Sequence, residues 1–230
     1  MGALVVAAIA AALAGGPAHG PLAGKTIAID PGHNGANWAH PDEINRLVDA
    51  GGFRKACDTT GTATAGGLTE ASYAFDVATR LSRILRRDGA RVVLTRSSNR
   101  GVGPCIDERA AIGNRARADA AISIHADGGP PGGRGFEVIY KPNDARSSAL
   151  ARAVRDAFSS TTREPFADYV GHDGLDVRTD LGGLNLSRVP KVLIETGNMR
   201  NAADARRLES AAYREREAVA LARGLEAFLG

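Results

Sequence analysis

The chain has few aromatic residues, only two cysteines and no concentrated run of basic side chains. Among its 230 residues, aromatics make up 5%, and 29 Lys and Arg against 26 Asp and Glu give a formal net charge of +3. Nucleic-acid binding calls for a basic stripe with stacking aromatics, whereas the arginines here are spread along predicted helices. The composition is that of an ordinary globular protein and argues against a nucleic-acid partner.

A long uncharged apolar run occurs at the start of the chain. Residues 2–14 carry no charge, and Gly15, Gly16, Pro17 and Ala18 follow them. This pattern resembles the apolar region and cleavage zone of a secretory signal, although the usual preceding positive charges are missing. The run is too short to span a bilayer comfortably. We expect residues 1–20 to be a signal-peptide-like leader, with the mature protein secreted to the periplasm or cell wall.

Cys57 and Cys105 both lie in segments rich in Gly, Thr and Pro, outside the predicted strands. An even number of cysteines in an exported protein favours a disulfide between them. A cysteine metal site is less favoured because neither residue has a close Cys or His neighbour. A cysteine nucleophile has little support.

Helical and strand patterns alternate from Lys25 onward, which predicts an α/β sheet covered by helices on both faces. Thr69 is a suitable N-cap for a helix that Gly89 would end. We expect a single domain over residues 25–230. The predicted strands are 25–30, 91–95, 120–124, 136–140 and 191–195, and the predicted helices are 70–88, 107–117, 145–159 and 213–229.

Two segments lack a clear pattern. Residues 34–67 are rich in Gly, Thr, Asp and Asn and have little apolar periodicity. A stretch of that length is usually a functional loop or a flexible hairpin. Residues 160–189 also read as loop, with short elements at most.

Two histidines and two glutamates stand at the ends of predicted elements. His33 and His125 follow apolar strands, Glu70 opens a helix, and Glu195 closes a strand. Sites in α/β sheets form at one edge of the sheet, so these side chains are expected to meet. A catalytic zinc takes three imidazole or carboxylate ligands and leaves one position open. We therefore predict Zn²⁺ held by His33, Glu70 and His125, with Glu195 moving the proton.

Each of these residues has an ordinary alternative role. A histidine at a strand end is more often a surface or hydrogen-bonding residue, and Glu70 could simply complement the helix dipole. Glu195 could pair with an arginine. The joint placement of all four favours the catalytic interpretation. His172, in a loop, is a reserve ligand whose more ordinary role is at the surface.

Five segments together resemble the zinc-dependent N-acetylmuramoyl-L-alanine amidases with an AmiC-like (type 3) catalytic domain. In chain order they are Asp30-Pro31-Gly32-His33, the helix that Glu70 opens, Ser123-Ile124-His125-Ala126, Gly135-Phe136-Glu137-Val138, and Leu193-Ile194-Glu195-Thr196-Gly197-Asn198. The resemblance covers roughly residues 25–228 and implies a twisted mixed sheet of about six strands. It also implies a peptidoglycan hydrolase that uses zinc-activated water to cut the amide between N-acetylmuramic acid and L-alanine.

The family's metal ligands correspond to His33, His125 and Glu70, and its catalytic glutamate corresponds to Glu195. The chain departs from the family pattern at Asp127, where Asn is usual, and at Asn198, where Phe is usual. These departures affect the rim of the site and its substrate preference. The expected partners are peptidoglycan or muramyl-peptide fragments, with a monomeric enzyme and an activator protein as an open possibility.

In some members of this family a helix blocks the zinc cleft until an activator removes it. Here only residues 42–48 could be helical, and Glu43 within them could reach a metal. We favour a mobile flap that shapes the groove, because Gly and Thr dominate the segment; a blocking helix is the alternative. A Cys57–Cys105 disulfide would tether this flap to residues 100–106.

Two other functions compete with the amidase. One is a zinc peptidase or deacetylase that acts on another amide. The other is a wall-binding module that keeps the fold without catalysis, but retention of all four candidate residues argues against it.

Overall fold

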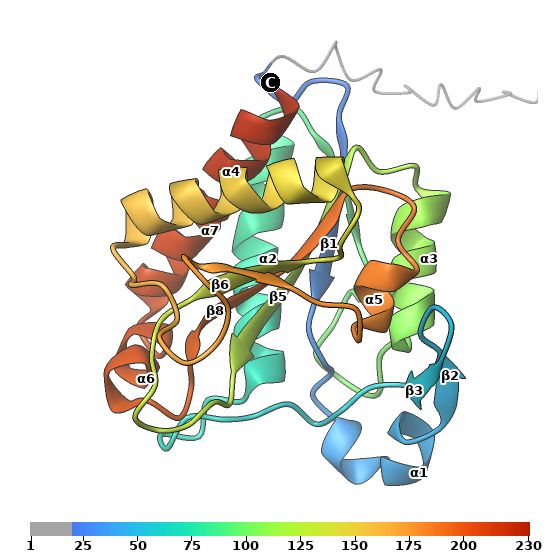
Figure 1. Cartoon of the computed structure of the whole chain (residues 1–230), viewed down its shortest axis with the longest axis vertical. Helices are drawn as coiled ribbons and strands as arrows, with labels where there is room; N and C mark the ends of the chain where they lie inside the picture. Colours follow the sequence, from blue (N-terminus) through green and yellow to red (C-terminus); the bar gives the residue numbers. More distant parts are fainter. Residues whose placement is uncertain (1–19) are drawn as a thin grey trace, which may run out of the picture.

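The computed structural model describes residues 20–230 and centres on a mixed sheet of six strands (Figure 1). Its strand order is β4 (Arg91–Leu94), β1 (Thr26–Pro31), β5 (Ala120–Asp127), β8 (Lys191–Asn198), β6 (Glu137–Tyr140) and β7 (Leu175–Val177). The first four strands are mutually parallel, whereas β6 runs antiparallel to β8 and β7 runs parallel to β6. The prediction of a mixed sheet of about six strands in a single domain is confirmed. The expected leader, apart from Gly20, lies outside the described residues.

Helices cover both faces of the sheet. Helices α2 (Glu70–Arg87), α4 (Ala145–Thr162) and α7 (Ala211–Leu229) pack with the sheet in the main apolar core. On the other face lie α3 (Ile106–Arg115) and the short α5 (Gly182–Asn185), while α6 (Ala202–Leu208) connects β8 to α7. Side chains alternate along β5, so Ile122 and Ile124 enter the main core and Ser123 and His125 take the opposite face.

The start of α2 is fixed by local sequence. Thr69 Oγ1 accepts a hydrogen bond from the Ser72 backbone N–H at 3.3 Å, which caps the helix. A stripe of buried residues at helical spacing, including Val77, Leu81 and Leu85, packs this helix on the sheet. Burying each such side chain contributes roughly 1.5–3 kcal/mol. The cap and the stripe together hold Glu70, the first helical residue, at the edge of the sheet.

The 34–67 insertion contains regular structure. A 3₁₀ turn (Asn37–Ala39) and helix α1 (Pro41–Ile44) precede a hairpin of β2 (Leu47–Asp49) and β3 (Arg54–Ala56). The suggestion of a helix over residues 42–48 is therefore wrong beyond Ile44, because the last of these residues pair across the hairpin. In Figure 1 this segment projects at one corner of the molecule, below α3 and α5.

Several boundaries also differ from the predictions. Strands β5 and β8 each run three residues past their predicted ends, so His125 and Glu195 lie inside strands. Helix α6 was not predicted, and α4 continues to Thr162, past its predicted end at residue 159. Across residues 20–230, no helix has the length and apolar character needed to cross a membrane.

Candidate metal centre and active site

Three of the predicted site residues come together at the edge of the sheet. Glu70 Oε1 lies 3.1 Å from His33 Nε2 and 2.8 Å from His125 Nδ1. One potential ligand atom from each of the three residues lies within 4.8 Å of the other two. Among residues 20–230, these three residues form the one group of His, Cys, Asp or Glu side chains that is compact enough to hold a metal ion.

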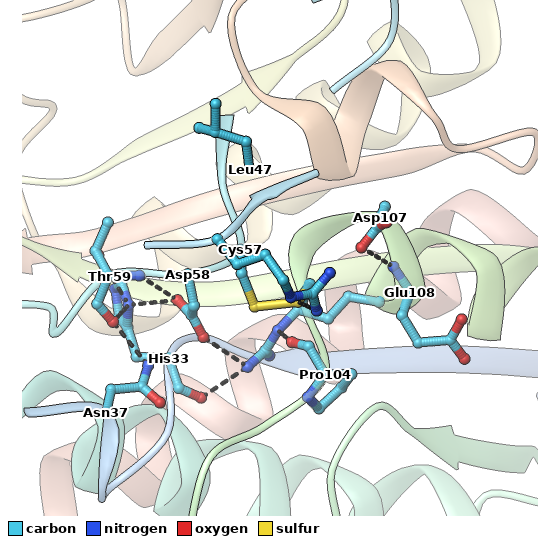
Figure 2. The surroundings of a disulfide bond; sticks show 12 residues. His33, Asn37, Leu47, Cys57, Asp58, Thr59, Pro104, Asp107 and Glu108 are labelled. Carbon is cyan, nitrogen blue, oxygen red and sulfur yellow. Dashed lines mark hydrogen bonds and ion pairs between the residues drawn. A yellow bond between two sulfur atoms is a disulfide. The ribbon is translucent and has the colours of Figure 1, made fainter. Parts of the chain in front are cut away.

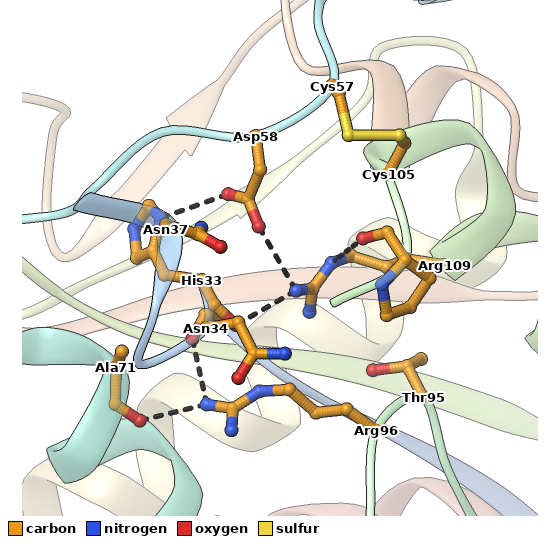
Figure 3. Close-up of polar contacts among 12 residues, drawn as sticks. His33, Asn34, Asn37, Cys57, Asp58, Ala71, Thr95, Arg96, Cys105 and Arg109 are labelled. Atoms are coloured by element: carbon orange, nitrogen blue, oxygen red, sulfur yellow. Dashed lines mark hydrogen bonds and ion pairs between the residues drawn. A yellow bond between two sulfur atoms is a disulfide. The ribbon is translucent and has the colours of Figure 1, made fainter. Parts of the chain in front are cut away.

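The His33 ring is oriented by hydrogen bonds on its outer nitrogen. His33 Nδ1 lies 3.1 Å from Asp58 Oδ1 and 3.1 Å from the Thr59 carbonyl oxygen, as Figures 2 and 3 show in part. Both neighbours are acceptors, so Nδ1 carries a proton, which leaves Nε2, on the Glu70 side of the ring, as the nitrogen that can bind a metal. A carboxylate behind a histidine ligand is a common way to fix its tautomer and orientation. Sequence reasoning missed Asp58, which stands alone in a polar loop.

Arg109, on α3, holds Asp58 in turn. Its guanidinium donates to Asp58 Oδ2 at 3.2 Å and to the His33 carbonyl at 2.9 Å (Figure 3). It also donates to Asp30 Oδ1 at 2.9 Å. Burial raises the pKa of Asp58, but the hydrogen bond from His33 and the charge of Arg109 lower it below its ordinary value. Asp58 therefore stays ionised and can accept a hydrogen bond from His33 Nδ1–H.

The predicted disulfide is present. Cys57 and Cys105 are joined across 48 residues of sequence, and their neighbours are drawn in Figure 2. Cys57 directly precedes Asp58, and Cys105 is the N-cap of the helix that carries Arg109. The disulfide therefore joins the two segments whose side chains form the Asp58–Arg109 pair. It also tethers the 34–67 insertion to the 100–106 loop, as expected.

A second buried arginine joins the His33 turn to α2. Arg96 donates to the Gly32 carbonyl at 3.1 Å and to the Ala71 carbonyl at 2.8 Å (Figure 3). Ala71 follows Glu70, so this contact sets the distance between the two ligand-bearing segments. The two arginines make the ends of β1, α2 and α3 one connected unit.

Glu70 and His125 are held by tight packing. Glu70 is 5% exposed, and its Oε2 accepts from the Thr62 backbone N–H at 3.0 Å. A Cβ added to Gly61 would come within 2.8 Å of that oxygen, and one added to Gly32 would overlap the His125 ring. Glycine is required at both positions because other atoms of the site occupy the space.

The electrostatics of this group favour a positive charge. Burial lowers the pKa of His33, but the carboxylates of Glu70 and Asp58 outweigh it and raise that pKa to about 10. Burial raises the pKa of Glu70, but the two histidines lower it well below its usual range. Two buried carboxylates that stabilise a cation here suit a divalent metal as well as a proton.

Glu195 lies beside this group, and within the described residues one of its carboxyl oxygens has no hydrogen-bond partner. It pairs in register with His125 across β5 and β8. Its Oε2 is enclosed and makes no hydrogen bond within residues 20–230. Burial, followed by the charges of Glu70, Asp127 and Glu137, raises the pKa of Glu195 well above that of an ordinary glutamate. Such a carboxyl is suited to taking up and returning a proton.

Two other candidates lie elsewhere. The Glu43 side chain is 57% exposed and faces His40 Nδ1 at 3.6 Å, outside the group of potential ligands. The His172 side chain is 91% exposed and pairs with Asp173, so its reserve role as a ligand is wrong.

The two departures from the family pattern have structural roles at the rim. Asp127 Oδ2 accepts a hydrogen bond from Tyr169 Oη at 2.8 Å. Asn198 Nδ2 donates to the carbonyls of Pro130 and Gly133 at 2.8 and 2.9 Å. Together they hold the 128–135 loop and the ring of Tyr169 beside the site.

A cavity of about 200 Å³ opens next to the two histidines. Asp30, Ser123 and Leu193 of the sheet lie at its base, and Lys55 of the hairpin and Leu184 of α5 line its sides. Lys55 Nζ donates to the Asp180 carbonyl at 2.8 Å, which joins the hairpin to the segment before α5. The hairpin thus helps to form the wall of this cavity.

A mixed α/β sheet with a His–Glu–His group at its edge and an unpaired glutamate beside it is an arrangement suited to metal-dependent hydrolysis. Residues 27–227 match the family described as N-acetylmuramoyl-L-alanine amidase. The chain belongs to this family, as its sequence motifs predicted.

Individual relatives agree with this assignment. N-acetylmuramoyl-L-alanine amidase Rv3717 of Mycobacterium tuberculosis is 44% identical over 215 residues, which cover 90% of this chain and 88% of the relative. The crystal structure of the amidase Ami1 from Mycobacterium smegmatis matches with a TM-score of 0.87 and 42% identity, covering 91% of this chain and 98% of that one. Apo Ami1 from Mycobacterium abscessus gives a TM-score of 0.86 and 41% identity, with coverages of 90% and 100%.

Proposed function

We propose that this amidase cuts the bond between N-acetylmuramic acid and L-alanine in peptidoglycan, with zinc held by His33, Glu70 and His125 and with Glu195 as the proton carrier. Family membership supports the reaction. The observation that carries the residue roles is the compact His–Glu–His group with an unpaired carboxyl opposite His125.

The donor set fits zinc. Two imidazole nitrogens and one carboxylate, oriented by a further carboxylate, are the ligands of many catalytic zinc sites. Zinc bound there would supply Lewis-acid activation of water and of the amide carbonyl. The chain's own residues then have to hold the ligands still, which Asp58, Arg109 and Thr62 do.

Glu195 accounts for the proton balance of the hydrolysis. Its carboxylate takes one proton from the attacking water, whose oxygen forms a bond to the carbonyl carbon. The carbon–nitrogen bond then breaks, and Glu195 returns the proton to the departing nitrogen. The products are the carboxyl group of the lactyl ether and the free amino group of L-alanine.

We also propose that the protein acts outside the cytoplasm, where peptidoglycan lies. The Cys57–Cys105 disulfide supports this placement, because disulfides persist in oxidising compartments. The leader-like residues 1–20 would direct export. We propose a monomeric enzyme, with an activator protein left as a possible partner.

We further propose that the hairpin shapes the substrate groove. Its residues line the cavity beside the histidines, and Lys55 and Ala50 are hydrogen-bonded to the segment around α5. Glu43 takes no part in this wall, since its carboxylate faces His40.

The test is mass spectrometry of purified peptidoglycan after incubation with the enzyme. We expect intact stem peptides with a free L-alanine amino group, together with glycan strands that have lost their peptides. The Glu195→Gln variant is the control and should release neither. Cleavage within the peptides, or loss of N-acetyl groups, would instead support a peptidase or a deacetylase.

A further inference from the structure

A second glutamate close to Glu195 is buried with one carboxyl oxygen left without a hydrogen bond in the part of the chain that the structure describes. Glu137 is 4% exposed, and its Oε2 is enclosed and makes no hydrogen bond within residues 20–230. An unsatisfied buried polar group costs roughly 1–3 kcal/mol, and more when it is charged. Such a group in a native protein therefore calls for an explanation.

The strand register places Glu137 in line with the active site. It lies directly opposite Glu195 across the antiparallel pair of β6 and β8, and Glu195 lies opposite His125 across β8 and β5. Residues opposite one another share a face of the sheet, with Cβ atoms about 4.5–5.5 Å apart in antiparallel pairs. His125, Glu195 and Glu137 thus form a row across three strands, leading away from the metal-binding group.

The surroundings of Glu137 do not neutralise it. Burial, then the carboxylates of Asp176 and Asp127, raise the pKa of Glu137 to about 7, and only Arg178 opposes them. The Arg178 guanidinium is itself bound to Asp180 at 2.7 Å. Tyr169 Oη, the nearby hydroxyl, already donates to Asp127.

A buried glutamate with a structural role looks different in this molecule. Glu164 is 3% exposed, and it binds Arg134 at 3.2 Å and accepts from Tyr213 Oη at 2.8 Å. Arg207 also contacts it. Glu164 thus has three donors around its carboxyl, whereas no hydrogen-bond donor to Glu137 occurs within residues 20–230.

We propose that Glu137 binds substrate, accepting a hydrogen bond from the scissile amide nitrogen and from the primary amine that this nitrogen becomes. The inference rests on the proposed amidase function. Because Glu195 must return a proton to that nitrogen, the nitrogen lies within hydrogen-bond reach of Glu195. On the β6 side of Glu195, the next side chain in the row is Glu137. A carboxylate beside a newly formed ammonium makes a charge-assisted hydrogen bond.

The first test compares Glu137→Gln with the wild type on a soluble muramyl-peptide. We expect kcat/KM to fall about 10- to 100-fold, as for the loss of one charge-assisted hydrogen bond. The melting temperature should stay the same or rise, because the variant removes an unpaired buried carboxyl. Glu108→Gln, which neutralises an exposed glutamate on α3, is the matched control and should leave both values unchanged.

The second test uses product inhibition, which a purely structural role would not affect selectively. The probes are L-alanyl-D-isoglutamine, with a free amino group, and the same dipeptide with an acetylated nitrogen. In Glu137→Gln the inhibition constant of the free amine, whose ammonium makes the charge-assisted hydrogen bond, should rise about tenfold, while that of the acetylated peptide, whose amide N–H makes a weaker one, should rise clearly less. In Glu137→Asp, which keeps a carboxyl, the inhibition constant of the free amine should rise less. This variant replaces Glu137→Gln in the test if Glu137→Gln does not fold.

The outcomes separate the two proposals. Equal effects on both inhibitors, or none on either, would overturn the role of Glu137 while the wild type still cleaves the muramyl-peptide. A wild-type protein that leaves the muramyl–alanine amide intact would overturn the proposed function itself.

Discussion

The two halves of the active site are built in opposite ways. On one side, the His33 ring has two hydrogen-bond acceptors on Nδ1, and Asp58 behind it is bound by Arg109. On the other side, Glu137 is buried and Glu195 is partly buried, and Oε2 of each is enclosed without a hydrogen bond within residues 20–230. Both sides lie at the same edge of one sheet and are joined by the pairing of β5 with β8.

The proposed roles explain this difference. Metal ligands must keep one geometry, and a network of hydrogen bonds around them fixes that geometry before the metal arrives. A proton carrier and a substrate-binding carboxyl must change partners during the reaction, so partners within the protein would compete with water and substrate. The free energy lost by leaving them unpaired is offset by the packed core beneath them.

The largest effect on activity should come from the side of the site that carries Glu195 and Glu137. Glu195→Gln keeps the shape of the side chain but cannot take up a proton, so kcat should fall about 10²- to 10⁴-fold. Zinc content, measured by inductively coupled plasma mass spectrometry, should equal that of the wild type. Loss of zinc together with activity in this variant would show that Glu195 is a metal ligand, and would contradict the division of the site into a metal-binding side and a proton-carrying side.

On the side of the site that carries His33 and Asp58, a substitution should lower zinc affinity more than kcat. Asp58→Asn weakens the acceptor behind His33, so we expect zinc affinity to fall about 10- to 100-fold. Excess zinc should restore most of kcat. Competition with a fluorescent chelator measures the affinity, and Asp156→Asn, an exposed aspartate on α4, is the control. Unchanged zinc affinity in Asp58→Asn would show that this carboxylate does not position the ligand.

Removing the disulfide should loosen the two segments that carry Asp58 and Arg109, because it joins them. Cys57→Ser combined with Cys105→Ser should lower the free energy of unfolding by about 2–4 kcal/mol. Hydrogen exchange should speed up over residues 34–67 and the start of α3 more than in the central strands. A uniform increase over the whole sheet would argue against a local role for this bond.

The smallest effect concerns the hairpin. A suitable variant replaces residues 48–55 with a short Gly-Ser linker between Leu47 and Ala56, which pair across the hairpin, and it leaves Asp58 in place. We expect KM for muramyl-peptides to rise several-fold with little change in kcat. A large gain in turnover would instead show that the hairpin blocks the groove.

The sequence predicted the parts of this molecule that local rules govern. The capping residue Thr69 and the stop at Gly89 correctly bounded α2, and the apolar runs located the central strands. All four candidate ligand and proton-carrier residues lie at one sheet edge because strand ends converge there. The disulfide followed from the cysteine count.

The rest depends on contacts between distant segments. Asp58 is one polar residue in a polar loop, and only its contact with His33, 25 residues away, gives it a role. The burial of Glu137 follows from β6 and β7 packing beside β8, which periodicity over four residues cannot predict. The hairpin did carry a local signal, the Gly51-Gly52 pair between short apolar runs, and α6 carried the Asn201 cap.

The most direct test is a crystal structure of the zinc-loaded protein with anomalous data collected at the zinc edge. We predict one peak, bound by His33 Nε2, His125 Nδ1 and the Glu70 carboxylate, with the Glu195 carboxyl beside it but not bound. A zinc ion held elsewhere, or no ion at this group despite full loading in solution, would contradict the account.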